Sequence, residues 1–369
     1  MRLLGPSSTS LSLSSFDILG FDLDHCLVQY HHEPLCDLCY SALVQHLVNH
    51  FHLSNTLLQT KFNHELCKRG SVLDFHTGNL LFVGRDFSVV KSYHGFEPVI
   101  VDELFSATKL LTTDRFLAIP TFFERAVSCV FATLVDYVEE KILNLQDLEE
   151  QIPQYSQFFS GKFSAIGYLL KNSMDFNFSK FDSGYYYCEF EKNPLKYVKK
   201  TPEVGAWLRQ LSPKLVLITN SLIPYANLLL KECLDVDPSV FTQRFYAANK
   251  PLFWINDKSR HDLIDLVESQ STMLYFGDHP VSDVARPSKE VIDLNSKQLL
   301  IKTVAIIEED IFSNVNSSSS NVSSEMPCWS SLFWIDYVFQ HAEFACQSLT
   351  SLARICEEGQ ELVIDSYSV

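Results

Sequence analysis

Three apolar runs of this sequence each stop abruptly at polar residues. The runs cover residues 16–21, 214–218 and 273–276, and each reads as a buried strand. They lead into Asp22-Leu23-Asp24, Thr219-Asn220-Ser221 and Gly277-Asp278. In a parallel sheet, functional groups gather beyond the carboxyl ends of the strands. The pattern therefore predicts that polar side chains far apart in the sequence meet at one edge of a sheet.

The chain after residue 200 alternates strands with helices, which is typical of an α/β layer with a parallel sheet. A helix is predicted to begin at Thr201-Pro202-Glu203, because Thr can cap a helix, Pro suits its first turn and Glu favours its positive end. It should end near Leu211. A further strand is predicted over 299–307, and the aromatic-rich stretch 329–352 is predicted to pack on the core as a helix.

The middle of the chain is predicted to be mainly helical. Apolar residues recur at helical spacing within 38–51 and 122–145. Two short runs, 72–75 and 80–83, predict a hairpin, and Tyr185-Tyr186-Tyr187 predicts a strand with alternating burial.

The acidic residues at the strand ends have the chemistry of a metal site. Asp22, Asp24 and Asp278, with Asp283 shortly after, offer the hard, oxygen-rich environment that Mg²⁺ prefers. Lys250 lies in a turn-like setting between the second and third strands, and a Lys beside such a site suits a phosphate. Attack of a carboxylate on a phosphate brings two anions together, so a divalent cation must offset their repulsion.

Carboxylates, a hydroxyl and a lysine in this arrangement are suited to phosphoryl transfer. Asp22 could attack phosphorus and form an aspartyl-phosphate. Asp24 would protonate the leaving oxygen and then deprotonate the water that hydrolyses the intermediate. Thr219 and neighbouring backbone N–H groups would bind phosphate oxygens where a strand gives way to a helix N-terminus. Lys250 would offset charge in the transition state.

Four short strings occur in a fixed order along the chain. They are Gly-Phe-Asp-Leu-Asp-His-Cys-Leu at 20–27, Leu-Ile-Thr-Asn-Ser at 217–221, Asn-Lys-Pro-Leu-Phe at 249–253 and Tyr-Phe-Gly-Asp-His-Pro-Val-Ser-Asp at 275–283. In this order they resemble motifs one to four of the haloacid-dehalogenase (HAD) superfamily. Within that superfamily the chain is similar to the cytosolic purine 5′-nucleotidase group.

The resemblance implies a Rossmann-like HAD core with a parallel sheet, interrupted by a large, mainly helical cap between motifs one and two. We therefore expect a discontinuous core from 16–30 and 200–369 and a cap domain at 31–199. Composition adds a flexible Ser-rich leader at 1–15 and a flexible Ser- and Asn-rich loop at 313–324.

The resemblance also implies a Mg²⁺-dependent 5′-nucleotidase that hydrolyses nucleoside 5′-monophosphates through an aspartyl-phosphate intermediate. By this resemblance, Asp22 is the nucleophile and a metal ligand, and Asp24 is the acid and base, with its backbone carbonyl also a ligand. Thr219, Asn220 and Lys250 bind phosphate. Asp278 is a Mg²⁺ ligand, and Asp283 is a ligand or orients the waters of the ion.

Two other functions stay open at this point. Cys26 stands where the family usually has Thr, and a thiol is a weaker hydrogen-bond donor than a hydroxyl. A catalytically weak binding or regulatory protein on the same fold is therefore one alternative, and a phosphatase of another small phosphorylated metabolite is a second. A zinc site at Cys36 and Cys39 is disfavoured, because no second Cys pair follows at finger-like spacing.

The charge of the chain restricts its partners. A formal net charge of -16 argues against nucleic-acid polymers and anionic membranes. No apolar stretch approaches the roughly 18 residues of a membrane span. The first fifteen residues lack the apolar core of a secretory signal, and ten Cys are expected as reduced thiols, so we expect a cytoplasmic protein. Base preference and oligomeric state stay open.

Overall fold

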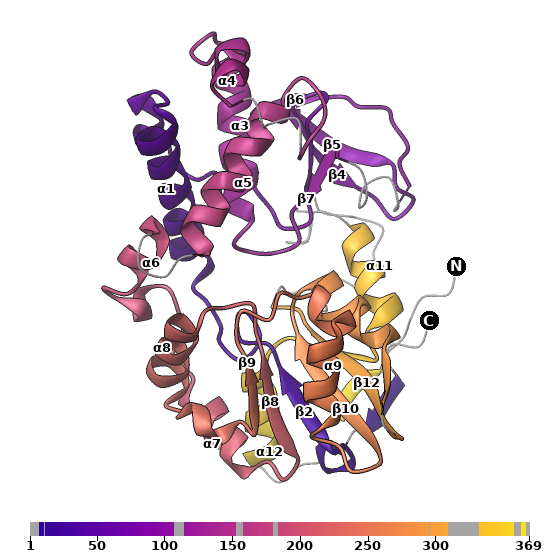
Figure 1. The fold of residues 1–369 in the computed structure, drawn as a ribbon. Coiled ribbons are helices and arrows are strands. Elements are labelled where there is room, and N and C mark those ends of the chain that lie inside the picture. The colour runs from indigo at the N-terminus through magenta and orange to yellow at the C-terminus, as the bar shows by residue number, and fades with distance from the viewer. Residues whose placement is uncertain are drawn as a thin grey trace. The chain divides into compact units, whose positions relative to one another are not determined.

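A computed structural model describes residues 7–10, 12–106, 114–152, 158–179, 184–294, 296–308, 332–357 and 363–366. The chain divides into two compact units (Figure 1). The first, here called the discontinuous unit, contains the described residues up to Tyr30, from 198 to 308 and from Asp336 on. The second, the inserted unit, contains His31–Tyr197 and residues 332–335. The chain thus leaves the first unit after Tyr30 and returns to it at Val198.

The discontinuous unit is built on one sheet. Its described strands are β1 (Ser7–Ser10), β2 (Ile18–Phe21), β8 (Lys214–Ile218), β9 (Gln243–Phe245), β10 (Gln270–Gly277), β11 (Val291–Leu294), β12 (Lys297–Ile306), β13 (Phe344–Cys346) and β14 (Val363–Ser366). They form a nine-stranded sheet in the order β1-β14-β13-β12-β10-β2-β8-β9, with β11 paired to β12 outside this path. Neighbours from β13 to β9 run parallel. The predicted α/β class with a parallel sheet is confirmed.

Strand β2 lies at the point where the strand order reverses. It pairs in parallel with β10 on one side and with β8 on the other, so that Ile18 lies opposite both Met273 and Lys214. The chain continues outward from β8 to β9 and, on the other side, from β10 to β12. Ligands of open α/β sheets bind beyond the strand ends at such a switch point. The residues that follow β2, β8 and β10 therefore lie at one edge of the sheet.

These central strands are apolar on both faces, as expected for parallel strands covered on both sides. All four residues of β2 are buried. Gly20 allows close packing there, since a Cβ at this position would collide with the Met273 side chain and lie 2.8 Å from Cδ2 of Tyr275. Ile18, Val216 and Trp254 belong to one buried cluster.

Helices accompany this sheet. The helices of the discontinuous unit are α7 (Pro202–Gln210), α8 (Ile223–Leu234), α9 (Asp257–Ile264) and α12 (Leu349–Glu357), and α11 (Leu332–His341) contains residues of both units. Helix α7 begins at Pro202 as predicted, although Thr201 makes no side-chain capping bond. The single helix predicted over 329–352 is wrong, because strand β13 separates α11 from α12.

The inserted unit combines helices with a second sheet (Figure 1). Its helices are α1 (His32–Phe51), α3 (Arg125–Glu139), α4 (Leu145–Gln151), α5 (Ser164–Phe178) and α6 (Tyr185–Phe190). Its strands are β3 (Val72–Asp74), β4 (Asn79–Val83), β5 (Val89–His94), β6 (Glu97–Val99) and β7 (Phe116–Ala118). Helix α1 packs against α3 and α5.

The structure tests two expectations for the inserted unit, the hairpin and the tyrosine strand. The predicted hairpin is confirmed as β3 and β4, but it forms part of a five-stranded antiparallel sheet in the order β6-β5-β4-β3-β7. Tyr185-Tyr186-Tyr187 begins helix α6 and is not a strand; Tyr186 and Tyr187 are buried there.

The remaining short helical segments of both units are the 3-10 helices η1 (Leu13–Ser15), η2 (Asn55–Gln59), η4 (Pro194–Lys196), η5 (Pro238–Val240), η6 (Leu252–Ile255) and η8 (Pro287–Lys289), and the π-helix η7 (Pro280–Ala285). Within the stretch predicted as a leader, β1 and η1 are described; the predicted loop at 313–324 lies outside the described residues. No described helix combines the length and the apolarity that a membrane span requires.

Candidate active site

Asp22 follows directly after β2 and is 7% exposed. Its backbone N–H donates to the carbonyl of Phe276 on β10, with 2.8 Å between the two atoms. The loop after β2 is therefore tied to the neighbouring strand at the point where β10 approaches Gly277-Asp278. This places Asp22 and Asp278 at the same edge of the sheet.

Lys250 brings two carboxylates together. Its Nζ lies 2.9 Å from Oδ1 of Asp22 and 2.7 Å from Oδ1 of Asp283, and its side chain is only 2% exposed. The Tyr275 hydroxyl lies 3.1 Å from both Lys250 Nζ and Asp283 Oδ1. The sequence analysis did not predict Tyr275 as a site residue. The signal that could have identified it is a phenol within an apolar strand, because a buried hydroxyl needs a polar partner.

Burial and charge shift the proton affinities at this point. Burial raises the pKa of Asp22 to about 8; the carboxylates of Asp283 and Asp24 act in the same direction, and Lys250 opposes them. Burial by itself lowers the pKa of Lys250, but Asp22 and Asp283 outweigh it and hold the pKa above its ordinary value. Lys250 is thus a permanently charged ammonium group.

Three buried carboxylates are suited to a divalent cation. One oxygen from each of Asp22, Asp278 and Asp283 lies within 4.8 Å of the others. Carboxylate oxygens are the ligands that hard cations prefer. Once all three are ionised, they exceed the single positive charge of Lys250, and a bound cation would offset the excess. The donor set therefore fits a divalent metal ion.

Asp24 is held by residues of two other segments. Its Oδ1 accepts a hydrogen bond of 2.5 Å from the Tyr30 hydroxyl, and its Oδ2 accepts one of 2.5 Å from Ser221 Oγ. Ser221 belongs to the polar end of β8, so Asp24 contacts the segment that follows this strand. The structure places Asp24 outside the trio of carboxylates described above.

Thr219 and Asn220 occupy different environments. Thr219 is buried, and its Oγ1 accepts a hydrogen bond from the backbone of Ser221 at 3.0 Å. The Asn220 side chain instead forms two hydrogen bonds with the backbone of Lys250. Its Oδ1 accepts from Lys250 N at 2.7 Å, and its Nδ2 donates to Lys250 O at 3.2 Å. This contact positions Lys250; a phosphate contact of Asn220 stays a prediction.

Cys26 stabilises the loop after β2. Its Sγ donates to the carbonyl of Phe276 at 3.3 Å, and burial raises the pKa of its thiol. The thiol thus bonds to the same carbonyl that accepts from Asp22 N. His279 has a related role at the next strand end, where its Nδ1 accepts from the backbone N–H groups of Val281 and Ser282.

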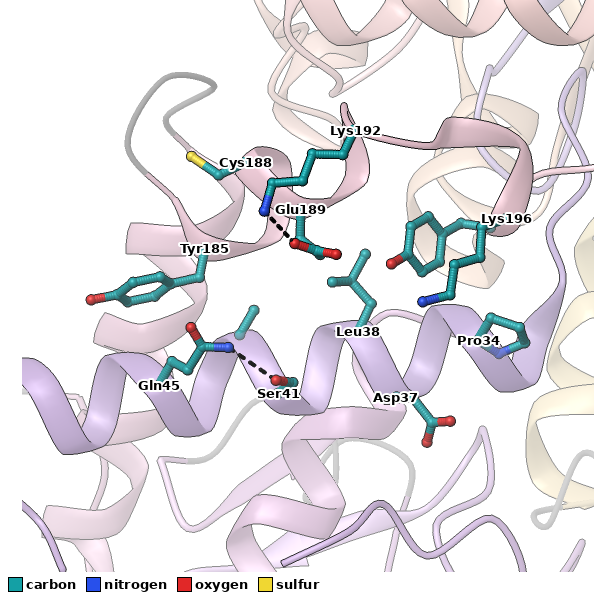
Figure 2. A pocket seen from close by; sticks show the side chains of 12 residues that line it. Pro34, Asp37, Leu38, Ser41, Gln45, Tyr185, Cys188, Glu189, Lys192 and Lys196 are labelled. Carbon is teal, nitrogen blue, oxygen red and sulfur yellow. Dashed lines mark hydrogen bonds and ion pairs between the residues drawn. The ribbon is translucent and has the colours of Figure 1, made fainter. Parts of the chain in front are cut away.

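A groove of about 510 Å³ in the inserted unit lies between α1 and the segment from α6 to Tyr197 (Figure 2). Its polar groups largely bind one another: Lys192 Nζ lies 2.6 Å from Glu189, and Gln45 donates to Ser41. Two lysines, Lys192 and Lys196, and two acids, Asp37 and Glu189, line it, so its formal charges balance. None of the predicted site residues lines this groove.

The buried thiols Cys36 and Cys39 belong to helix α1. Neither is part of a cluster of His, Cys, Asp and Glu able to hold a metal ion among the described residues.

Comparison with known proteins supports the HAD resemblance. The chain is 29% identical to human 5′-nucleotidase domain-containing protein 1 over 252 residues, 63% of this chain and 52% of that protein. A 5′-nucleotidase domain-containing protein of Dictyostelium discoideum is 24% identical over 332 residues, 77% of this chain and 53% of that protein. The chain thus spans about half the length of these relatives. A model of the 5′-nucleotidase family matches residues 7–271, and this chain therefore belongs to that family.

Proposed function

We propose that this protein is a Mg²⁺-dependent phosphomonoesterase that hydrolyses nucleoside 5′-monophosphates. The observation that carries the proposal is the buried group of Asp22, Asp278 and Asp283 around Lys250, at the edge where a parallel α/β sheet binds ligands. Family membership supports the substrate class. The roles of a core and a cap for the discontinuous and inserted units are part of the same proposal.

The side chains divide the reaction into two displacements. Asp22 attacks phosphorus, the bond to the ester oxygen breaks, and Asp24 donates a proton to the departing alcohol. Asp24, now a carboxylate, then accepts a proton from a water molecule that attacks the aspartyl-phosphate, which releases phosphate and restores the Asp22 carboxylate and the protonated Asp24. The cation, when bound, would neutralise phosphate charge. Asp22, Asp278 and Asp283 would hold it, with the backbone carbonyl of Asp24 as a further ligand.

Phosphate is bound by the polar end of β8 and by Lys250 in this proposal. Thr219 accepts from Ser221 N, so its hydroxyl proton can still be donated to a phosphate oxygen. Lys250 carries a fixed positive charge beside the nucleophile. The Asn220 side chain fixes the position of Lys250 by a hydrogen bond to its backbone N–H.

We also propose a cytoplasmic location. The described cysteines are free thiols, and most of them, such as Cys26 and Cys233, are buried. Reduced thiols are typical of cytosolic proteins. Microscopy of the tagged full chain should show diffuse cytoplasmic signal; accumulation in a secretory compartment would contradict this.

The test is phosphate release from a panel of nucleoside 5′-monophosphates and sugar phosphates with MgCl₂. Asp22→Asn should abolish turnover, whereas Asp17→Asn, at the opposite end of β2, should retain it. The Asp17 side chain accepts a hydrogen bond from the β10 backbone, with 2.8 Å between its Oδ2 and Thr272 N. Release from sugar phosphates alone would favour another phosphatase. No release from any ester would exclude the nucleotidase and favour a binding or regulatory protein.

A further inference from the structure

We infer that Tyr30 is a positioning residue for Asp24, supported in this role by Tyr225. The inference rests on the proposed function, in which Asp24 exchanges protons with the leaving group and with water. Tyr30 is 1% exposed, and its hydroxyl donates to Asp24 Oδ1 over 2.5 Å.

The hydroxyl of Tyr225 is the next group in this hydrogen-bond chain. It lies 2.9 Å from the hydroxyl of Tyr30, and Tyr225 is also buried. A phenol carries a single proton. Since the Tyr30 proton is directed to Asp24, Tyr225 donates to Tyr30. The chain of donors therefore runs from the first turn of α8, through Tyr30, to Asp24.

The second oxygen of Asp24 is held independently. Ser221 Oγ donates to Oδ2 over 2.5 Å, and Ser221 is itself fixed by the contact of its N–H with Thr219. Two donors from different segments determine the plane of the carboxylate. The two oxygens of a carboxyl group together have about four lone-pair positions, so each oxygen keeps one for the proton that passes to the leaving group or comes from a water. Tyr30 thus orients the Asp24 carboxyl group and leaves part of its hydrogen-bonding capacity unused.

Tyr30 is also fixed along the backbone. It forms an isolated antiparallel bridge with Val198, and Lys199 N donates to Gln29 O over 2.8 Å. These are the residues at which the chain leaves and re-enters the discontinuous unit. The donor that orients Asp24 is therefore anchored at the start of the insertion.

Tyr30→Phe removes the donor and keeps the buried ring. With Mg²⁺ and a nucleoside 5′-monophosphate, kcat should fall about 10- to 100-fold while KM changes less than about three-fold, because the acid is misoriented and substrate binding is not. Tyr225→Phe should give a smaller fall. Tyr40→Phe is the matched control: Tyr40 is buried in the inserted unit, and its hydroxyl contacts Thr60 and Thr133 at 2.7 and 3.3 Å. Its kcat should stay near that of the wild type.

A spectroscopic measurement makes the test independent of turnover. In protein labelled at aspartate ¹³Cγ, the Asp24 signal, assigned through Asp24→Asn, should move in Tyr30→Phe and stay unchanged in Tyr40→Phe. An unmoved signal overturns the inference, whatever the activity. A moved signal with unchanged kcat also overturns it, since orientation would then not matter. If the wild type hydrolyses no ester, the proposed function fails, and the signal still decides whether Tyr30 orients Asp24.

Discussion

The side chain of Lys250 is a buried ammonium group that contacts two carboxylates at once. Asp22 and Asp283 lie on separate segments, and both bond to its Nζ. Removal of Lys250 would leave these carboxylates without their shared cation in a site shielded from water. Loss of one partner of a buried ion pair is far more costly than loss of a surface pair.

We expect Lys250→Met to lower the free energy of unfolding at pH 9 by about 3–5 kcal/mol. The loss should be smaller at pH 6, because the Asp22 carboxyl, with its pKa of about 8, takes up a proton and ceases to be a buried charge. Urea unfolding at both pH values measures this. Lys231→Met, at an exposed lysine, should change stability by less than about 0.5 kcal/mol. An equal loss in both variants would contradict the charge balance described here.

The raised pKa of Asp22 predicts how metal binding depends on pH. The folded pKa of about 8 lies above the reference value of 3.8. The folded state therefore holds this proton more tightly than the unfolded state, and the stability from this group is lost as pH rises from about 4 to about 8. A cation that binds the ionised carboxylate must displace the proton.

Mg²⁺ should accordingly raise the melting temperature more at pH 8.5 than at pH 6, with apparent affinity increasing up to about ten-fold per pH unit below 8. Thermal shift titrations with MgCl₂ measure both quantities. Asp278→Asn should lose most of the shift, whereas Asp293→Asn, an exposed acid on β11, should retain it. An equal shift at both pH values would argue against Asp22 as a ligand.

At the scale of elements, the sheet edge depends on contacts between the ends of its strands. The segment after β8 is tied to the segment before η6 by the Asn220 side chain, which bonds both the N–H and the carbonyl of Lys250. Tyr275 on β10 completes this arrangement, since its hydroxyl lies 3.1 Å from the carbonyl of Ile218 on β8. Hydrogen bonds thus connect three segments next to the carboxylates: the end of β8, the segment before η6, and β10.

Asn220→Ala should release the backbone of Lys250 and lower kcat/KM about ten-fold, because a small displacement of a charged group is costly at an active site. Stability should fall by about 1–3 kcal/mol. Asn227→Ala is the control. The Oδ1 of Asn227 accepts a hydrogen bond of 3.1 Å from the Tyr246 hydroxyl and takes no part in the contact between Asn220 and Lys250. Steady-state kinetics should show kcat/KM unchanged there. A similar kinetic loss in both variants would contradict a specific role of Asn220.

At the scale of the whole molecule, the charge of the protein opposes that of its proposed substrate. The formal net charge is -16, and a nucleoside monophosphate is an anion. Screening reduces the reach of this field from about 30 Å at 0.01 M salt to about 8 Å at 0.15 M. Lys250 and a bound cation act at contact distance and are screened much less.

Raising NaCl from 10 to 150 mM, with Mg²⁺ saturating, should therefore increase kcat/KM about two- to ten-fold. The kcat at saturating substrate should stay within a factor of about two, because the bound substrate already lies beside Lys250. A decrease of kcat/KM with salt would mean that the local cations, and not the overall charge, dominate substrate capture.

The positions of several candidate-site residues were predictable because these residues follow strands. Asp22, Thr219 and Asp278 stand where apolar runs end, and a parallel sheet brings such ends together. Tyr30 and Tyr275 have no such pattern: their contacts depend on which residues lie opposite them after folding. The insertion was less predictable still, since pairing of β3 with β7 joins segments about forty residues apart.

The sequence by itself determined the α/β class, the order of the motifs and the positions of the central strands, because hydrophobic runs and the polar residues that end them are local signals. The tertiary structure alone decided that Asn220 clasps Lys250, that Tyr30 and Ser221 hold Asp24, and that the insertion contains a second sheet. The physical reason is that these contacts join side chains up to 197 positions apart, and their geometry is set by strand register and packing.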